Sequence, residues 1–281
     1  MALTGPLACL LLLLGAGSPG VAWAQTPSPL LEWQYESGVI LANLFEPNLP
    51  NWRVIVGPSG QLQPLYDGSR IYRAQGGPLI DIRYRNIAYF SVGEGLGVDL
   101  LRDTHFRAGV SLGYDQGRSV QDDPTHLRGL GDIPPAPVAK VYSSIVLARA
   151  FPLILRVDVR QFIGDAGGMV GDLGVYVPLP GSSKTFVMFA GPSITFANHR
   201  YLQKEFGVTA SQALASGYPR FDARAGRVSE GVGFSATGFF TKNWLINVTG
   251  AINRLLGSAS GSPITQRRTQ DVVTLAVGYM W

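Results

Sequence analysis

The chain has 281 residues, including 35 glycines and one cysteine, and its formal net charge is +4. Charged residues make up 15%, well below the roughly 25% of an average soluble domain, and the 46% of hydrophobic residues excludes intrinsic disorder. The lone cysteine, Cys9, excludes a disulfide scaffold and a cysteine-ligated metal centre. Basic residues are scattered, with Arg267 and Arg268 as the one adjacent pair, so nucleic acid is not an expected partner.

The N-terminus has the pattern of an export signal. An apolar run at residues 7–16 is followed by small residues, and residues 22–24 have the A-x-A form of a cleavage site. We therefore predict a signal peptide over residues 1–24 that is cleaved after Ala24. Beyond this point no run of 18 or more charge-free apolar residues indicates a transmembrane helix.

The rest of the chain alternates apolar and polar residues with a period of two. The alternation is clear at residues 79–85, 104–115, 153–163 and 244–253. Strands of this length exceed the usual ~5–6 residues and reach the ~9–11 needed to cross a bilayer at a tilt. A soluble β-sandwich would bury the apolar face, whereas an outer-membrane barrel turns it toward lipid. Strand length and aromatic residues near the strand ends favour the barrel.

We predict an all-β fold, a transmembrane antiparallel up-and-down β-barrel of about 12 strands, with 10 as the alternative. Counting from Ile87 gives nine strands, residues 79–85 and 52–63 add two, and residues 33–43 would supply the twelfth. Residues 52–281 form the barrel, and residues 25–51 form an N-terminal extension with room for a first strand. Short connections alternate with longer ones, which places the C-terminus on the periplasmic side. The longer ones are expected at about 116–137, 164–170, 198–221 and 256–270.

The last residues carry the most specific pattern in the chain. Val277, Tyr279 and Trp281 continue a row of apolar side chains at every second position, and Trp281 ends the sequence. Such an ending resembles the signal by which the bacterial barrel-assembly machinery recognises its clients. We predict that these three residues form that signal.

A series of short motifs points to a family. The motifs are PLYDGS at residues 64–69, LRGLGDI at 127–133, GDLG at 171–174, GPSITFA at 191–197, FGVT at 206–209, RLLG at 254–257 and SPI at 262–264. In this order they resemble the MipA/OmpV family of outer-membrane proteins, over about residues 52–281. Residues 25–51 have no counterpart, and residues 204–206 replace an aromatic-rich step of the family pattern.

The resemblance implies a non-enzymatic protein of the outer membrane of a Gram-negative bacterium. It implies a scaffolding or interaction role in murein (peptidoglycan) synthesis, with a lytic transglycosylase and a penicillin-binding protein as partners. The alternative that it implies is a small channel or surface protein involved in osmotic response, antibiotic entry or adhesion. Outer-membrane lipid and the barrel-assembly machinery are the other expected partners.

The sequence indicates no catalytic site. His105 and Ser111 lie on one predicted strand about 20 Å apart, too far for a catalytic pair. His126, close to Asp122 and Asp123, is expected in a solvated acidic loop. We therefore predict no enzyme activity, no cofactor and no catalytic or metal-binding residue.

Charged residues of the predicted strands fall on the polar face, toward the lumen. They are Asp81, Arg83, Arg85, Asp99, Arg107, Asp115, Arg156, Asp158 and Arg160. One interpretation is a narrow, mildly anion-preferring pore. The favoured one is a lumen closed by arginine–carboxylate networks, because a barrel of ten to twelve strands is near the width that side chains fill.

One long connection contains a helical pattern. Residues 209–215 are expected to form a helical turn or two, with Thr209 or Ser211 as the N-cap. We expect the segment from Tyr201 to Tyr218 to fold over or into the barrel mouth, and to gate or plug the barrel there.

Overall fold

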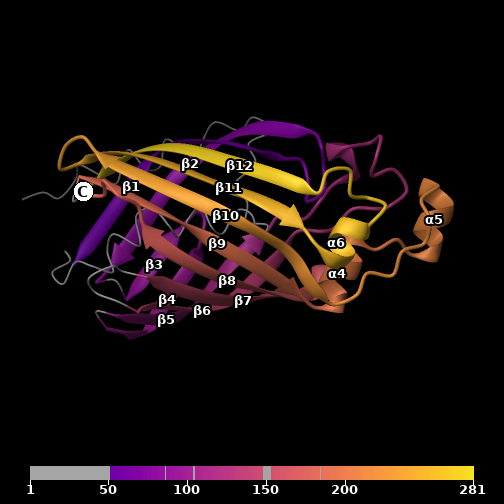
Figure 1. Cartoon of the computed structure of the whole chain (residues 1–281), viewed down its shortest axis with the longest axis horizontal. Helices are drawn as coiled ribbons and strands as arrows, with labels where there is room; N and C mark the ends of the chain where they lie inside the picture. The colour runs from indigo at the N-terminus through magenta and orange to yellow at the C-terminus, as the bar shows by residue number, and fades with distance from the viewer. Residues whose placement is uncertain (1–50, 86, 104, 148–152, 184) are drawn as a thin grey trace, which may run out of the picture.

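A computed structural model describes residues 51–85, 87–103, 105–147, 153–183 and 185–281. Figure 1 shows a single antiparallel barrel with helices at one end, and its twelve strands close on themselves. This confirms the predicted twelve-stranded all-β barrel. The predicted signal peptide over residues 1–24, the extension up to residue 50 and the strand at 33–43 lie outside the described residues.

The strands follow one another around the barrel in chain order. They are β1 (Trp52–Pro64), β2 (Tyr72–Tyr84), β3 (Ala88–Ser91), β4 (Gly95–Arg102), β5 (Phe106–Asp115), β6 (Ala136–Val146), β7 (Ile154–Phe162), β8 (Gly168–Pro178), β9 (Phe186–Ala197), β10 (Gly226–Phe239), β11 (Trp244–Leu255) and β12 (Thr269–Met280). β12 pairs back with β1, from Ile55 opposite Met280 to Leu62 opposite Val273, which closes the barrel.

The prediction of nine strands from Ile87 onward is wrong, because ten strands follow this residue. β3 and β4 form a short hairpin whose turn is residues 92–94, where the sequence prediction saw one strand. Apolar residues recur at every second position on both sides of this turn, and Glu94 is the one interruption, so the period of two is only briefly broken there. Gly95 begins β4 with a φ of +79°, and an added Cβ would lie 2.3 Å from the Leu112 carbonyl oxygen, so only glycine fits.

The alternation along each strand separates a charged lumen from an apolar outer surface. On β6, Lys140 points inward and is 4% exposed, whereas its neighbour Val141 points outward and is 61% exposed. Leu96 and Leu112 are also more than half exposed on the outer face. An apolar belt on the outside of a barrel is the surface that contacts lipid.

The two ends of the barrel differ strongly. The connections from β2 to β3, from β4 to β5 and from β10 to β11 are short, and they lie at the end that holds the C-terminus (Figure 1). Because barrels of this kind have short periplasmic turns, we assign this end to the periplasm. Among the described residues, no helix combines the length and the apolar character that crossing a bilayer requires.

Helices and long loops form a cap at the external end. We define the cap as residues 65–71, 116–135, 198–225 and 256–268. It contains the helices α4 (His199–Phe206), α5 (Ala210–Ser216) and α6 (Gly257–Gly261) and the 3-10 helix η2 (Val120–Asp122). A second 3-10 helix, η3 (Gly164–Ala166), joins β7 to β8. Thr209 is the N-cap of α5, as predicted, and its side chain accepts a hydrogen bond from the backbone of Gln212.

Helix α4 lies inside the barrel mouth rather than above it. Its side chains Tyr201, Leu202 and Phe206 belong to one buried cluster with Phe162 of β7 and Val228 of β10. The sequence analysis did not predict this helix, which begins after Asn198. The external mouth is therefore filled by apolar packing against the inner faces of the strands.

Candidate functional site

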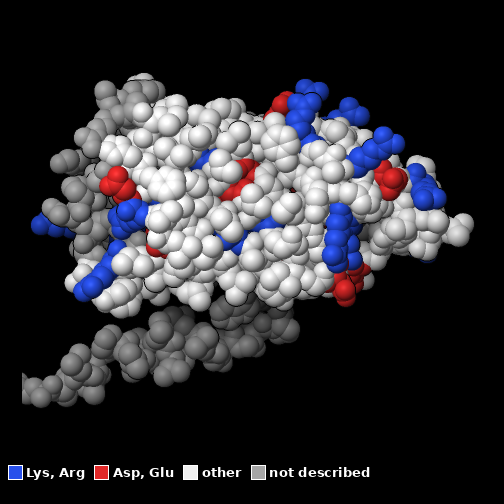
Figure 2. Space-filling view, turned by 90° about the horizontal axis from the view of Figure 1, so that it is seen from below, with Lys and Arg blue, Asp and Glu red and all other residues white. Residues whose placement is uncertain are grey.

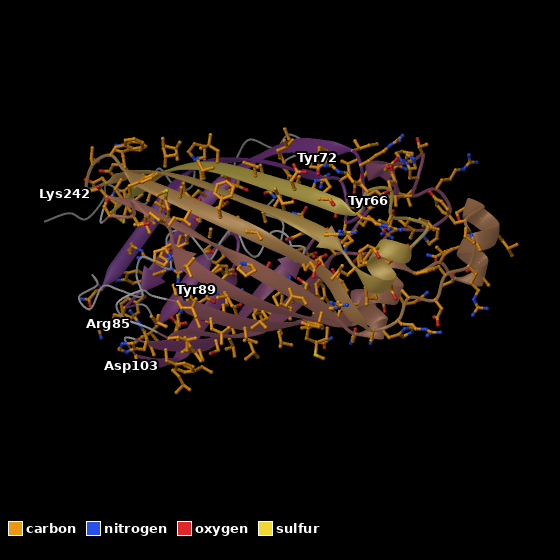
Figure 3. All side chains as sticks on the ribbon, viewed as in Figure 1. Tyr66, Tyr72, Arg85, Tyr89, Asp103 and Lys242 are labelled. Atoms are coloured by element: carbon orange, nitrogen blue, oxygen red, sulfur yellow. The ribbon has the colours of Figure 1, made fainter. Side chains whose placement is uncertain are left out.

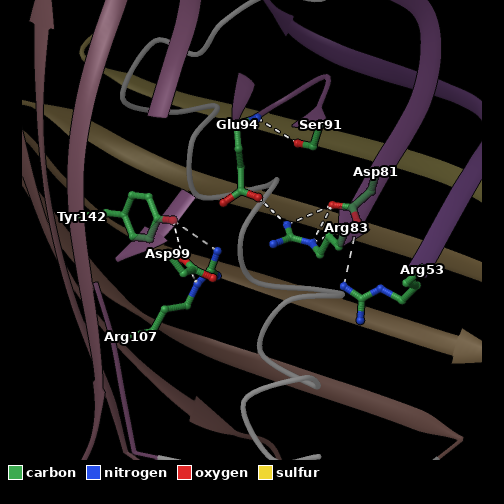
Figure 4. A network of polar contacts seen from close by, with 8 residues as sticks. All are labelled: Arg53, Asp81, Arg83, Ser91, Glu94, Asp99, Arg107 and Tyr142. Atoms are coloured by element: carbon green, nitrogen blue, oxygen red, sulfur yellow. Dashed lines mark hydrogen bonds and ion pairs between the residues drawn. The ribbon is translucent and has the colours of Figure 1, made fainter. Parts of the chain in front are cut away.

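Among the described residues, the charged side chains of the lumen form three clusters, and Arg83 is the centre of the first (Figure 4). Its Nη2 donates to Asp81 Oδ2 at 2.9 Å and to Glu94 Oε2 at 2.5 Å. Nη2 of Arg53 lies 3.8 Å from Oδ1 of Asp81. The Glu94 backbone N–H donates to Ser91 Oγ at 3.0 Å. Because Glu94 lies in the turn between β3 and β4, Arg83 ties the tip of this hairpin to the wall at β2.

The second cluster joins β4, β5 and β6. Arg107 Nε donates to Asp99 Oδ1 at 2.6 Å, and the Tyr142 hydroxyl donates to the same oxygen at 2.5 Å. The Arg107 guanidinium also lies 5.2 Å from the centroid of the Tyr142 ring and 5.5 Å from that of Tyr89. The arginine thus has both a carboxylate and two aromatic faces as partners.

The third cluster lies on the inner face of β7 and β8. Asp158 and Asp172 are directly opposite each other in the strand register. Arg160 bonds to Asp172, and its Nε lies 3.5 Å from Asp158, so one arginine sits between two carboxylates. Arg156 Nε lies 3.7 Å from the other oxygen of Asp158. One buried and one partly buried carboxylate lie side by side and repel each other, and these arginines compensate for that repulsion.

Most predicted lumen residues belong to these clusters, and two do not. Asp81, Arg83, Arg107, Arg156, Asp158 and Arg160 are all less than a tenth exposed and face the lumen. Asp115, at the end of β5, instead accepts a hydrogen bond from the Gly117 backbone at 2.7 Å. The placement of Arg85 in the lumen is wrong, because this residue is exposed in the β2–β3 turn with a φ of +49°. At a turn the period of two no longer applies.

Several lumen residues were missed by the sequence analysis. They are Arg53, Glu94, Lys140, Tyr142 and Asp172. Lys140 and Tyr142 alternate with outward-facing apolar residues, so a closer reading of the same period could have found them. Glu94 could not be found this way, because its position depends on an unexpected turn.

Acidic side chains also gather beneath the cap. Burial, with a smaller contribution from the nearby carboxylate of Asp115, raises the pKa of Asp67 to about 6 and that of Glu205 to about 7. Arg118 opposes this effect, with its Nη1 3.8 Å from Glu205 Oε2. These groups change charge near neutral pH, where most carboxylates do not.

The periplasmic rim carries exposed charge. Figure 3 shows Arg85, Asp103 and Lys242 at the end of the barrel opposite α5. All three are exposed, as is Arg102, so positive charge prevails at this rim.

The predicted assembly signal lies on the outer face of β12 at the same end. The ring of Tyr279 is 4.6 Å from that of Trp281 and 5.1 Å from that of Trp244 on β11. Val277 faces the same side and pairs with Ile246. The three residues therefore lie in one row beside the membrane, and their recognition by the assembly machinery stays a prediction.

The histidines lie in or near the connections. His126 Nδ1 is 2.9 Å from Asp123 Oδ2, and His199 Nδ1 is 2.7 Å from the Ala223 carbonyl oxygen. Across the described ranges, no three His, Cys, Asp or Glu side chains are grouped in a way that could hold a metal ion.

The chain is similar to several outer-membrane proteins of known structure. It matches the CymD monoaromatic hydrocarbon channel at 7% identity and a TM-score of 0.42, covering 93% of this chain and 94% of that chain. It matches OmpT of Vibrio cholerae at 9% identity and a TM-score of 0.35, covering 83% and 99%. Neisserial surface protein A matches at 6% identity and a TM-score of 0.24, covering 82% and 96%. A comparison with curated proteins gives no match.

A family model shows the relationship that these distant similarities do not. The model described as MltA-interacting protein MipA matches residues 56–281. The match begins within β1 and continues through β12, so it covers nearly all of the barrel. This outer-membrane β-barrel therefore belongs to the MltA-interacting protein MipA family.

Proposed function

We propose that this barrel is a non-enzymatic scaffold that holds murein-synthesis enzymes, a lytic transglycosylase and a penicillin-binding protein, at the outer membrane. The observation that carries the proposal is the network of paired charges in the lumen. Arg83, Arg107 and Arg160 are each less than a tenth exposed and bonded to a carboxylate. A conducting pore keeps its charged lining in water, whereas these charges satisfy one another. The family description, which names an interacting protein, supports the same conclusion.

The periplasmic rim is the surface on which such a partner would bind. Arg85, Arg102 and Lys242 give it a positive charge, so the proposed partner presents an acidic patch. Charge complementarity of this kind speeds association and orients the two proteins. The predicted extension at residues 25–51 directly precedes β1, which starts at this rim, and would add to the contact.

Site-specific photo-crosslinking in intact envelopes tests the proposal. A photoreactive residue replaces Lys242 at the rim, and a matched one replaces Leu214 of the external cap, which is 91% exposed. We expect the rim position to capture a lytic transglycosylase or a penicillin-binding protein, and the cap position to capture neither. Equal capture at both positions, or capture of neither enzyme at the rim, would contradict the scaffold proposal.

A small channel or surface protein, with a role in osmotic response, antibiotic entry or adhesion, is the second candidate. The observation that favours a channel is a cavity of about 50 Å³ inside the barrel, between the β3–β4 turn and β11. Single-channel recording of the refolded protein in a planar bilayer separates the two proposals. Reproducible openings that weaken in the variant Arg107→Gln would support the channel, and silence from a folded barrel would support the scaffold.

A further inference from the structure

The barrel wall is incomplete between β2 and β5. β2 pairs with β1 along its whole length, but it pairs with β3 only from Asp81 to Tyr84. β4 pairs with β5 no further than Leu96 opposite Leu112. Above the turn at residues 92–94 neither β3 nor β4 is present, and no pairing among the described residues joins β2 directly to β5.

This interruption has defined borders, and we call it the window. Residues 74–80 of β2 form one side, residues 113–115 of β5 form the other, and the turn at 92–94 forms the base. The top is bridged by an ion pair at 3.2 Å between Arg73 of β2 and Asp122 of η2. The window is about 23 Å high along β2, the length of seven residues of strand. Its width is up to about 14 Å, because two strands are absent between β2 and β5 at this height.

The backbone along the β2 side of the window presents both carbonyl oxygens and N–H groups, except at Pro78, where a carbonyl stands alone. The Ile80 carbonyl points toward β3, since it accepts the Val92 N–H at 3.0 Å. Groups on every second residue of a strand point the same way, so Pro78 and Gly76 also face the window. Pro78 has a carbonyl but no N–H to offer. Such an edge is poorly suited to pairing with a peptide strand, and its carbonyl oxygens require donors when they lie in the membrane.

The window opens toward the lipid side of the protein. Leu112 and Tyr114 of β5, beside the window, are 53% and 51% exposed on the outer face. Figure 2 shows charged atoms in the middle of an otherwise uncharged outer face. On β2 itself, Asp81 and Arg83 lie below the window, opposite β3, and point into the lumen.

Behind the window lies the cavity of about 50 Å³. Pro78, Ile80 and Val92 line it and also border the window, so the cavity adjoins the window. The rest of its wall is aliphatic, with Ile55, Leu79 and Leu245, together with hydroxyl, amide and carboxylate groups from β1, β2, β11 and β12. An aliphatic wall with a few polar groups is the usual composition of a small-molecule site.

We propose that the window admits small uncharged aliphatic amphiphiles, such as alcohols, from the lipid phase, and that they bind in the cavity behind it. The aliphatic wall fits the body of such a molecule, and its hydroxyl supplies the donor that the carbonyl edge requires. α4 fills the external mouth, so the window offers a route to the cavity that does not pass through that mouth. This inference does not rest on the scaffold proposal.

Fluorine NMR of the full mature protein in lipid nanodiscs tests the route, with 6-fluorohexan-1-ol as the probe. Gly76 lies at the window, and its register partner Gly60 lies one strand away on β1. An added Cβ has no neighbour within 4 Å at Gly60 and a single one at 3.8 Å at Gly76, so both positions accept a cysteine. We expect pyrene-maleimide on the variant Gly76→Cys to slow exchange of bound probe at least tenfold, and the same label on Gly60→Cys to change it less than twofold.

The binding site is tested separately from the route. 1-Fluorohexane, which lacks the hydroxyl, should bind about three- to tenfold more weakly than the alcohol, as expected for one hydrogen bond. The variant Ala276→Leu, which fills the cavity, should remove the bound signal, and Ser59→Leu is the second choice if heat-modifiable migration shows that the first does not fold. The proposal is overturned if wild-type protein gives no saturable bound signal, or if the two labels slow exchange equally.

Discussion

Removing Arg83 should destabilise the barrel more than removing any exposed arginine. In the variant Arg83→Met, Glu94, whose side chain is 2% exposed, loses its ion pair at 2.5 Å, while Asp81 retains Arg53 at 3.8 Å. Breaking a buried pair from one side typically costs about 3–5 kcal/mol, because an uncompensated charge stays buried. The side chain of Arg83 is 4% exposed, so solvent screening does not reduce this figure. We therefore expect a loss of about 3–5 kcal/mol in the free energy of unfolding.

The assay is equilibrium unfolding by denaturant in phospholipid vesicles, followed by tryptophan fluorescence. The double variant Arg83→Met with Glu94→Gln removes the uncompensated charge, so it should recover about 1–3 kcal/mol relative to the sum of the single changes. Arg85→Met is the matched control, since the same change at an exposed turn should stay within about 0.5 kcal/mol of wild type. A loss below about 1 kcal/mol for Arg83→Met, or strict additivity in the double variant, would refute the reasoning.

Three further predictions concern the cap and β1. Burial raises the pKa of Asp67 to about 6 and of Glu205 to about 7, above their unfolded values, so the folded cap favours the protonated forms. The stability of the cap should therefore be greatest below about pH 4 and decline as the pH rises through 6 to 7. Hydrogen exchange in the cap, corrected for intrinsic rates, measures this, and exchange that slows as the pH rises would contradict the prediction. In β1, Gly57→Ala places a Cβ 1.8 Å from a β12 carbonyl oxygen and should lower the free energy of unfolding in vesicles by about 1–3 kcal/mol. At Gly60 an added Cβ meets no atom, so Gly60→Ala should cost less than about 0.5 kcal/mol. Equal effects of the two variants would disprove the contact. Thr209→Ala removes the N-cap of α5 and should lower the free energy of local opening of α5, measured by hydrogen exchange, by about 1 kcal/mol without changing global unfolding. Unchanged exchange in α5 would show that the cap bond is not formed.

The alternation of residues predicted the faces of most strands. Arg107, Arg156 and Arg160 could be placed in the lumen because each follows a regular period between apolar neighbours. The period fails where the backbone turns, which explains the errors at Arg85 and at the β3–β4 hairpin. The sequence around Glu94 reads Gly-Glu-Gly, and this pair of glycines was the available sign of a turn.

The pairing of charges could not be predicted from the sequence. Which carboxylate meets Arg160 depends on the register between β7 and β8, and a shift of one residue reverses every side chain on a strand. The position of α4 was also out of reach. Its apolar residues Leu202 and Phe206 indicate a buried face, but only the closed barrel shows that this face packs inside the mouth.

The seam between β1 and β12 sets an order on folding. Leu62 pairs with Val273, so two strands that lie far apart in the sequence must meet before the barrel is closed. Contacts between residues so far apart in sequence form slowly, because a long loop must close first. While β12 is absent, β1 and β11 both expose unpaired backbone that can template wrong pairings. A chain shortened at its C-terminus would therefore fail as a trapped, aggregation-prone intermediate rather than as a smaller barrel.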